Sequence, residues 1–160
     1  MIPRRRPSTR RLVASVIGLG FIPRRLWGSD TGAGTFGAAF AALGGLGLLW
    51  LDAPWWITLA VAALLVLLSL WASAPFAIDG EDPGWVCIDE AAGTMIALVG
   101  LGGLPWVVAL VVARLADIFK VLPGVRAAEE GLPGAIGVTA DDAVAGLYGL
   151  AAGWGIAALF

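Results

Sequence analysis

The sequence predicts an all-α, membrane-embedded helical bundle. Hydrophobic residues make up 59% of the 160 residues, charged residues make up 14%, and the mean hydropathy is +0.90. Four stretches contain no charged residue, namely residues 31–51, 53–78, 91–113 and 143–160. Each is close to the roughly 20 residues that an α-helix needs to cross a bilayer. We therefore expect two full spans, a re-entrant helical hairpin and a C-terminal apolar helix rather than a soluble domain.

A basic segment, residues 1–30, precedes the first apolar stretch. It holds seven of the ten basic residues, which are Arg4, Arg5, Arg6, Arg10, Arg11, Arg24 and Arg25. Positively charged flanks tend to stay in the cytoplasm, so we expect a cytoplasmic N-terminus. Arginines at a membrane surface also attract anionic lipid. We interpret residues 1–30 as a basic N-terminal membrane-surface segment, with a purely topological arm as the alternative, and residues 31–160 as one integral-membrane domain.

The first two apolar stretches predict two antiparallel spans, Thr31 to Leu51 and Trp55 to Phe76. A short turn, Asp52 to Pro54, joins them. Tryptophans gather around this turn at Trp50, Trp55 and Trp56. Tryptophan favours membrane interfaces, so these three residues predict an aromatic belt on the far side of the membrane.

The third apolar stretch, residues 91–113, is interrupted in its middle by the sequence Gly100 to Pro105. Glycine and proline break helices, which leaves two halves that are each too short to cross a bilayer. The polar segment Ile78 to Glu90 should bring the chain back to the cytoplasmic surface. A straight span would then separate Glu90 from Arg114, whereas a re-entrant hairpin returns both to one face, and we expect the hairpin.

Four carboxylates stand in two adjacent pairs at the mouths of apolar stretches: Asp89 with Glu90, and Asp141 with Asp142. An unpaired charge near hydrocarbon costs several kcal/mol, so such pairs usually bind an ion or do chemistry. Two pairs indicate a divalent cation. The spacing from Thr139 to Asp142 resembles a capping box, and we expect both aspartates at the positive end of the last helix.

Three charged residues, Arg114, Asp117 and Lys120, recur at intervals of three and should share one helix face. A solvated helix end with local ion pairs explains this pattern as well as a binding site does. The chain has no histidine, which excludes a Ser-His-Asp triad and most zinc sites. The single cysteine, Cys87, forms no intrachain disulfide and is expected to be a small packing residue.

Four blocks in this order resemble the bacterial phosphatidylglycerophosphatase A family, a group of magnesium-dependent lipid phosphatases of the inner membrane. They are GLGFIP with GAGTFGA (Gly18 to Pro23 and Gly32 to Ala38), DPGWVCIDEAAGTMIAL (Asp82 to Leu98), RLADIFKVLP (Arg114 to Pro123) and LPGAIGVTADDAVAGLY (Leu132 to Tyr148). Together they extend from about Gly18 to the C-terminus, which makes the likeness far more specific than any one motif.

The resemblance implies hydrolysis of the terminal phosphomonoester of phosphatidylglycerophosphate to phosphatidylglycerol and phosphate. Residues 31–160 would then be a single integral-membrane phosphatase domain with its active site on the cytoplasmic side. Hard oxygen ligands suit Mg²⁺, so the candidate metal ligands are Asp89, Glu90, Asp141 and Asp142. Arg114 and Lys120 would bind phosphate oxygens, with Asp117 orienting them or the nucleophile. A glycine-rich anion-binding nest beside Thr35 is a further candidate.

A metal-activated water is the expected nucleophile, and an aspartyl-phosphate intermediate is the alternative. The expected partners are the lipid substrate and the bilayer, with no nucleic acid. A rival class is a small cation transporter or channel-like protein that uses the carboxylates as an ion site and the hairpin as its path. Loss of turnover on Asp142→Asn would distinguish an enzyme from a structural anchor.

Overall fold

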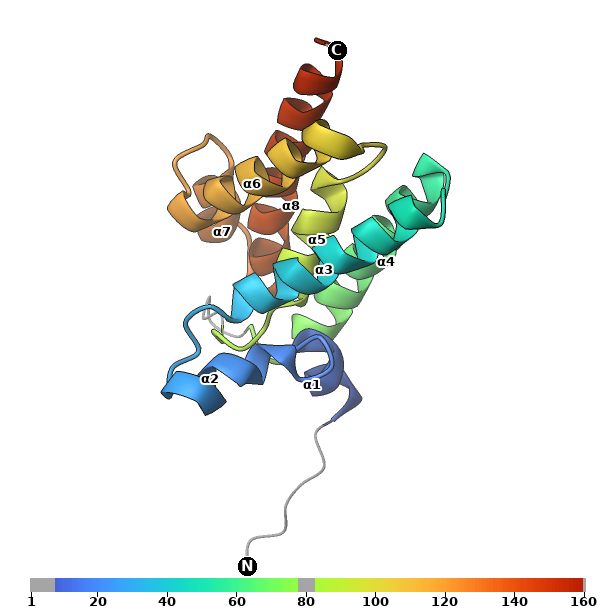
Figure 1. The fold of residues 1–160 in the computed structure, drawn as a ribbon. Helices are drawn as coiled ribbons and strands as arrows, with labels where there is room; N and C mark the ends of the chain where they lie inside the picture. Colours follow the sequence, from blue (N-terminus) through green and yellow to red (C-terminus); the bar gives the residue numbers. More distant parts are fainter. Residues whose placement is uncertain (1–7, 78–82, 160) are drawn as a thin grey trace, which may run out of the picture.

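A computed structural model describes residues 8–77 and 83–159, and the regular elements in these ranges are all helices (Figure 1). The prediction of an all-α fold is confirmed. The elements are α1 (Thr9–Ala14), the short 3-10 helix η1 (Leu19–Phe21), α2 (Ile22–Trp27), α3 (Ala33–Trp50), α4 (Trp55–Ser73), α5 (Ile88–Ala97), α6 (Gly103–Phe119), α7 (Val125–Gly131) and α8 (Gly134–Ala157). Part of the predicted polar return, residues 78–82, lies outside the described residues, as do residues 1–7.

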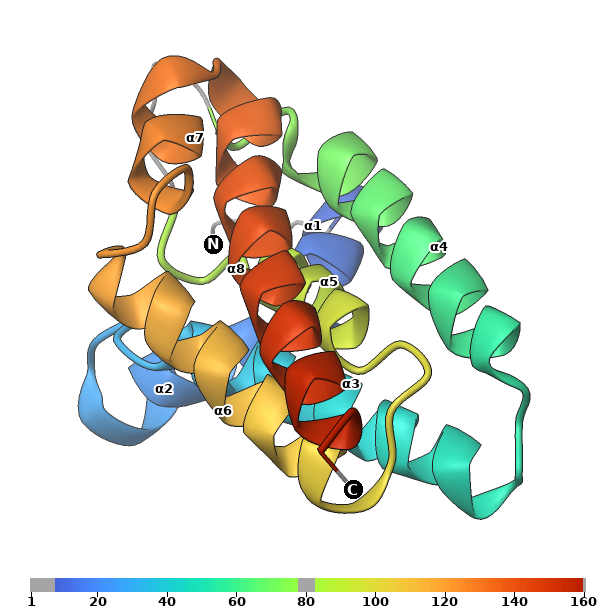
Figure 2. The same ribbon diagram turned by 90° about the horizontal axis from the view of Figure 1, so that it is seen from above.

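Helices α3 and α4 match the two predicted spans. Both are long and apolar enough to cross a membrane, with mean hydropathies of 1.5 and 2.2. The turn between them begins at Asp52, whose φ of 51° lies in the left-handed region that aspartate tolerates. The two helices diverge from this turn, and α5 packs between them (Figure 2). Their placement in a bilayer stays a prediction.

The tightest packing joins α8 to α5 and α6. Three glycines of α8, Gly146, Gly149 and Gly153, lie on one helix face where the backbones of the neighbouring helices approach. A Cβ at Gly146 would overlap the carbonyl oxygen of Gly93 in α5, and one at Gly149 would meet Ala109 in α6. Small residues permit this close approach because no side chain separates the helices.

Residues 98–102 interrupt the third apolar stretch, as the glycines there predict. Gly100 has a φ of +70° and Gly103 a φ of +58°, a conformation that favours glycine. The chain reverses after this break, so Arg114 and Asp117 of α6 lie close to Asp142 of α8. The break therefore returns the charged end of α6 to the acidic residues, while a re-entrant position in a membrane stays a prediction.

The last helix begins earlier than the sequence pattern indicates. Helix α8 starts at Gly134, directly after Pro133, so Asp141 and Asp142 lie about two turns inside the helix and not at its positive end. The capping-box interpretation is therefore wrong. The added turns are held against α4, because Thr139 is buried and its hydroxyl forms a hydrogen bond of 2.8 Å with that of Ser69.

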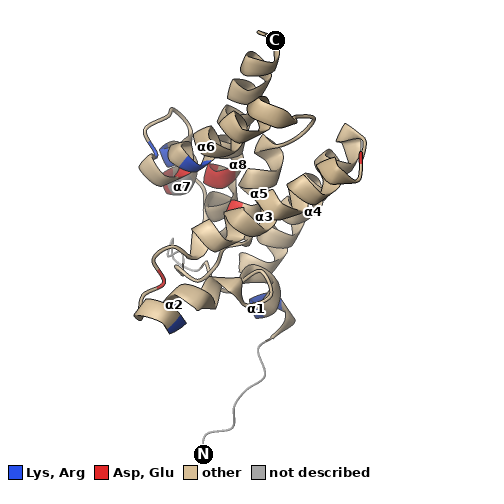
Figure 3. Ribbon diagram, viewed as in Figure 1, with Lys and Arg blue, Asp and Glu red and all other residues tan. Residues whose placement is uncertain are grey.

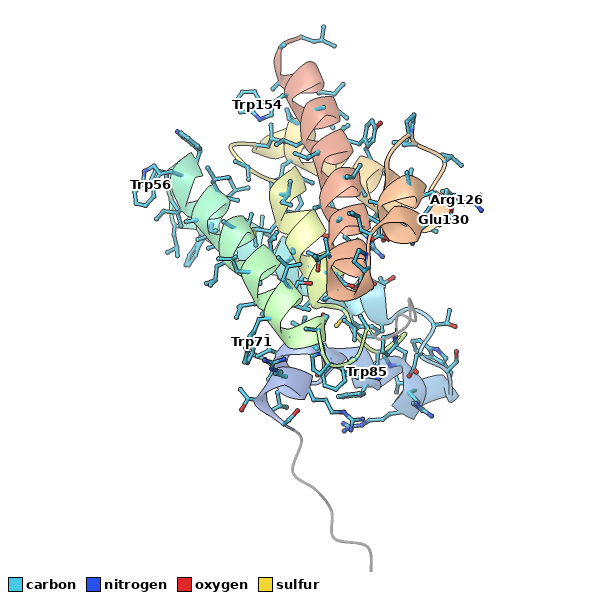
Figure 4. All side chains as sticks on the ribbon, turned by 180° about the vertical axis from the view of Figure 1, so that it is seen from behind. Trp56, Trp71, Trp85, Arg126, Glu130 and Trp154 are labelled. Atoms are coloured by element: carbon cyan, nitrogen blue, oxygen red, sulfur yellow. The ribbon has the colours of Figure 1, made fainter. Side chains whose placement is uncertain are left out.

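The N-terminal elements α1, η1 and α2 lie across one end of the bundle (Figure 1). The amide of Cys87 donates a hydrogen bond of 2.9 Å to the carbonyl of Ala14, and the ring of Trp85 stacks on Phe21 at 5.1 Å. Trp71 and Trp85 lie at this end, whereas Trp56 and Trp154 lie at the opposite end (Figure 4). Tryptophans at both ends of a bundle are typical of two membrane interfaces.

Candidate metal centre

Three of the four predicted metal ligands converge. Asp89 and Glu90 occupy the first turn of α5, and Asp142 projects from α8. One carboxylate oxygen from each lies within 4.8 Å of the others, so the three can hold one ion. We call these residues the carboxylate trio. The close crossing at Gly93 brings the trio together, because a larger residue there would overlap the backbone of Asp142.

Two residues of the carboxylate trio are buried and Glu90 is half-buried, although carboxylates normally remain in water. Asp89 is 2% exposed and Asp142 is 6% exposed, and the Oε2 atom of Glu90 has no hydrogen-bond partner among the described residues. Burial raises the pKa of Asp89, and it raises the pKa values of Glu90 and Asp142 well above the ordinary range, with further contributions from neighbouring negative charges.

This arrangement fits a hard divalent cation. Burying three carboxylates against one another is unfavourable unless a positive charge compensates them. An oxygen-only ligand set matches the preference of Mg²⁺ and similar ions. The orphaned Oε2 of Glu90 supplies an acceptor that such an ion would satisfy. The trio could therefore hold a metal ion, and Mg²⁺ as its identity stays a prediction.

The fourth predicted ligand, Asp141, is engaged differently. Its Oδ2 accepts a hydrogen bond of 2.8 Å from Lys120, and its Oδ1 accepts one of 2.9 Å from the amide of Asp142. Burial raises the pKa of Asp141 to about 6, and Lys120 opposes this rise. Asp141 is not one of the three residues whose oxygens converge. Its role as a ligand stays a prediction, and its observed contact is an ion pair.

Lys120 does not share the helix face of Arg114 and Asp117. Helix α6 ends at Phe119, and Lys120 follows in the left-handed conformation with a φ of 49°. This turn directs its side chain to Asp141 on α8. The prediction that all three charges lie on one face of a helix is therefore wrong for Lys120, because the helix ends one residue earlier.

Arg114 and Asp117 form an ion pair of 2.6 Å at the edge of the carboxylate trio. Both side chains are largely buried, and together with Asp142 they line a small enclosed gap that has no room for a water molecule. The positive charge of Arg114 lowers the pKa of Asp142, against the larger effect of burial. A guanidinium beside a candidate metal site is well suited to bind phosphate oxygens in a fixed geometry.

Two residues near this centre escaped the sequence analysis. Thr94 lines the same gap as Arg114, and its buried hydroxyl has no hydrogen-bond partner among the described residues. Its position four residues after Glu90 places it on the same face of α5, which is the signal that could have identified it. Asp30 likewise has a buried, unpartnered Oδ1, but it lies in an irregular segment where no periodicity identifies it.

An open pocket of about 540 Å³ reaches the carboxylate trio from outside, and Glu90 and residues 29–34 contribute to its lining. A Cβ at Gly34 would overlap the carboxylate of Glu90, so a larger residue there would displace that side chain. Thr35 is exposed in the first turn of α3 and directly follows Gly34, which lines this pocket. Its amide and that of Phe36 already donate to the carbonyl of Gly32, which leaves few amides for the predicted anion nest.

Charge is unevenly distributed over the bundle. Acidic and basic positions gather where α6, α7 and α8 meet, while α3 and α4 are uncharged along their lengths (Figure 3). Cys87 precedes the acidic pair and is fully buried. Burial raises the pKa of its thiol to about 12, so it is a packing residue, as predicted, and not a nucleophile at neutral pH.

Comparisons with known proteins find similarity to proteins named as lipid phosphatases. A family model described as Phosphatidylglycerophosphatase A matches residues 12–157. A protein of Bacteroides thetaiotaomicron named "Putative phosphatidylinositol-3-phosphatase" is 34% identical over 146 residues, which cover 86% of each chain. No solved structure matches this chain.

Proposed function

Because this chain belongs to the phosphatidylglycerophosphatase A family, we propose that it hydrolyses the terminal phosphomonoester of phosphatidylglycerophosphate. The products would be phosphatidylglycerol and inorganic phosphate. The observation that carries the proposal is the convergence of Asp89, Glu90 and Asp142 in a buried site within 4.8 Å. A phosphomonoester dianion cannot approach three carboxylates unless positive charge is present, and the site has both a place for a cation and Arg114 beside it.

A magnesium ion is the proposed cofactor, with Asp89, Glu90 and Asp142 as its ligands. When bound, such an ion offsets negative charge on phosphate and lowers the pKa of water. The protein supplies the rest of the site. Glu90 belongs to the trio and also lines the open pocket, so the carboxylate oxygen that does not hold the ion could take a proton from the attacking water.

The basic residues would hold the phosphate. Arg114 can donate two parallel hydrogen bonds to phosphate oxygens, and its ion pair with Asp117 fixes the direction of the guanidinium. Lys120 and Asp141 lie next to this centre and stabilise each other through their ion pair. We propose that Lys120 adds positive charge at the phosphate, with Asp141 holding its ammonium in place.

The fold suits a substrate that stays in the membrane. The diacylglycerol part of the lipid can remain in the leaflet while the phosphorylated headgroup enters the pocket beside Glu90. Helices α3 and α4, which are long and apolar enough to span, would anchor the site at the cytoplasmic face of the bacterial inner membrane.

The test is phosphate release by the full chain purified in detergent, with Mg²⁺ or with a chelator. We expect release from phosphatidylglycerophosphate that needs the metal and disappears in Asp89→Asn. Phosphatidylinositol 3-phosphate should be assayed alongside, because the curated relative carries that activity in its name. If folded wild-type protein released phosphate from neither lipid, the phosphatase proposal would be wrong, and Mg²⁺ flux into proteoliposomes would become the next measurement.

A further inference from the structure

A second pocket lies on the N-terminal elements. It has a volume of about 550 Å³ and is lined by three arginines, Arg11, Arg24 and Arg25, together with Ile17 and Phe21. It is formed by α1, η1, α2 and the turns between them, whereas the carboxylate trio lies on α5 and α8. We call it the arginine pocket.

The arginine pocket carries net positive charge. Arg11 and Arg25 form no salt bridge with a described residue, and Arg24 makes a single pair of 3.5 Å with Asp30 while remaining 66% exposed. The guanidinium of Arg11 lies 5.0 Å from the ring centre of Phe21 and 5.3 Å from that of Trp85, which fixes its position. Preplaced guanidinium groups with few internal partners are well suited to bind phosphate.

The rim of the pocket combines backbone strain with exposed apolar surface. Val16 and Ile17 have φ values of 46° and 58°, which is unfavourable for β-branched residues. The amide of Ile17 donates a hydrogen bond of 2.7 Å to the carbonyl of Leu12, which holds this turn, and the side chain of Ile17 is left 79% exposed while Val16 is buried. Leu12, at the pocket, and Trp27 are also exposed. The rim therefore presents exposed apolar side chains beside the arginines, an arrangement suited to contact with an apolar partner.

The position of these elements matches a membrane surface. They lie across the end of the bundle (Figure 1), and Trp71 and Trp85 lie at the same end (Figure 4). The guanidinium of Arg10 lies 5.0 Å from the ring centre of Trp71, near the end of an apolar helix that is long enough to span. Cationic and apolar groups side by side at such an end fit the headgroup layer of a bilayer.

We propose that the arginine pocket binds the phosphate group of an anionic phospholipid, with Ile17 and Leu12 contacting its acyl chains. The chemistry recognised is a phosphate with a negative charge, which a lipid headgroup or a free phosphate could provide. The exposed apolar rim favours the lipid. This site is separate from the carboxylate trio, so its occupation does not depend on the proposed phosphatase activity.

Native mass spectrometry of the full chain in neutral detergent tests the proposal. The probes are short-chain phosphatidylglycerol, short-chain phosphatidylcholine and inorganic phosphate, each with a chelator present so that the carboxylate trio binds no metal. We expect phosphatidylglycerol to bind about tenfold more tightly than phosphatidylcholine. Arg25→Gln should remove most of this preference, and Arg11→Gln should do the same provided that its thermal unfolding stays normal.

Two further variants make the result decisive. Arg126→Gln removes the same charge from an exposed position on α7, where Arg126 pairs with Glu130, and should keep the preference. Ile17→Gly relieves the left-handed strain, so it should raise the unfolding temperature while weakening lipid binding. Equal binding of both lipids, or an Arg25→Gln variant that keeps the preference, overturns the proposal. Displacement of the lipid by inorganic phosphate at equal concentration identifies a free-phosphate site instead.

Discussion

Helices α4 and α8 have similar lengths, 19 and 24 residues, but they differ in which side chains they expose and which they bury. Both bury small residues. The buried residues of α4 are Thr58, Ala62, Ser69, Ala72 and Ser73. Those of α8 are Gly137, Thr139, Asp141, Asp142, Ala145, Gly146, Gly149 and Gly153. Helix α4 exposes its large apolar residues, including Leu59, Leu64, Leu67 and Trp71. Helix α8 instead carries two carboxylates into the interior.

The comparison shows that two environments shape this molecule. Exposed leucines along α4 would be favoured by apolar surroundings such as a bilayer, which stays a prediction. Buried aspartates on α8 need positive charge nearby, which Lys120 and Arg114 supply and which a cation held by the trio would increase. One helix therefore exposes an apolar surface, and the other contributes a carboxylate to the candidate metal centre.

The largest expected effect comes from the acidic side of this comparison. Asp142→Asn removes one charge of the carboxylate trio and should lower phosphate release at least about 100-fold, because it weakens metal binding. Asp52→Asn is the matched control, since Asp52 is exposed in the turn before α4 and asparagine tolerates its left-handed φ. Equal activities of the two variants would contradict the metal centre.

The small residues of α8 can be tested with alanine. Gly146→Ala places a Cβ against the carbonyl of Gly93 and should destabilise the protein by about 1 to 3 kcal/mol through overpacking. Gly155→Ala, in the same helix, meets nothing within 4 Å and should be neutral or stabilising by up to about 1 kcal/mol. Thermal unfolding in detergent compares them. If both changes had the same effect, the close crossing would not matter for stability.

Metal removal should make stability depend on pH in a defined direction. Without metal, the pKa values of the trio are raised, and the pKa of Asp141 is raised to about 6. The folded protein therefore retains protons that the unfolded chain releases above about pH 4. The free energy of unfolding should therefore fall as pH rises through about 4 to 6 and beyond.

Mg²⁺ should restore this stability near neutral pH, by about 2.7 kcal/mol when it is present at about 100 times its dissociation constant. Unfolding temperatures measured across this pH range, with chelator and with Mg²⁺, check the prediction. The pH dependence should be weaker in Asp142→Asn, since one buried carboxylate is missing. A stability that rises with pH in chelator would show that the trio is not strained when metal-free.

The last prediction concerns the contact between the two compared helices. Ser69 of α4 and Thr139 of α8 form a buried hydrogen bond of 2.8 Å. Ser69→Ala or Thr139→Val should each cost about 1 to 3 kcal/mol, because the remaining hydroxyl loses its partner. The double variant should cost less than the sum of the two. Additive losses in this double-mutant cycle would show that the two hydroxyls do not stabilise each other.

The sequence predicted the parts of the fold that follow from local composition. Uncharged runs of suitable length gave α3 and α4 within a few residues, and the glycines around Gly100 marked the break between α5 and α6. It failed where long-range contacts decide local structure. Helix α8 extends back to Gly134, and its added turns bring Thr139 to Ser69 of α4, a contact that the local sequence does not indicate.

The site shows the same division. Residue type and order were enough to select Asp89, Glu90 and Asp142 as candidate metal ligands, because an uncompensated carboxylate near an apolar run is energetically unfavourable. They were not enough to assign Asp141 to Lys120, since that pairing depends on the left-handed turn after α6. Thr94 and Asp30 were missed because a single hydroxyl or carboxylate has no pattern until its neighbours are known.

By itself, the sequence determined an all-helical, apolar chain with acidic pairs at the mouths of its apolar stretches, and its motifs identified the family. The tertiary structure decided which carboxylates converge and which pair with a base. The composition and the charge pattern can be read from the sequence alone, because they do not depend on which residues are in contact. A ligand set depends on helices crossing within contact distance, and here that distance is set by glycines 93 and 146, more than fifty residues apart.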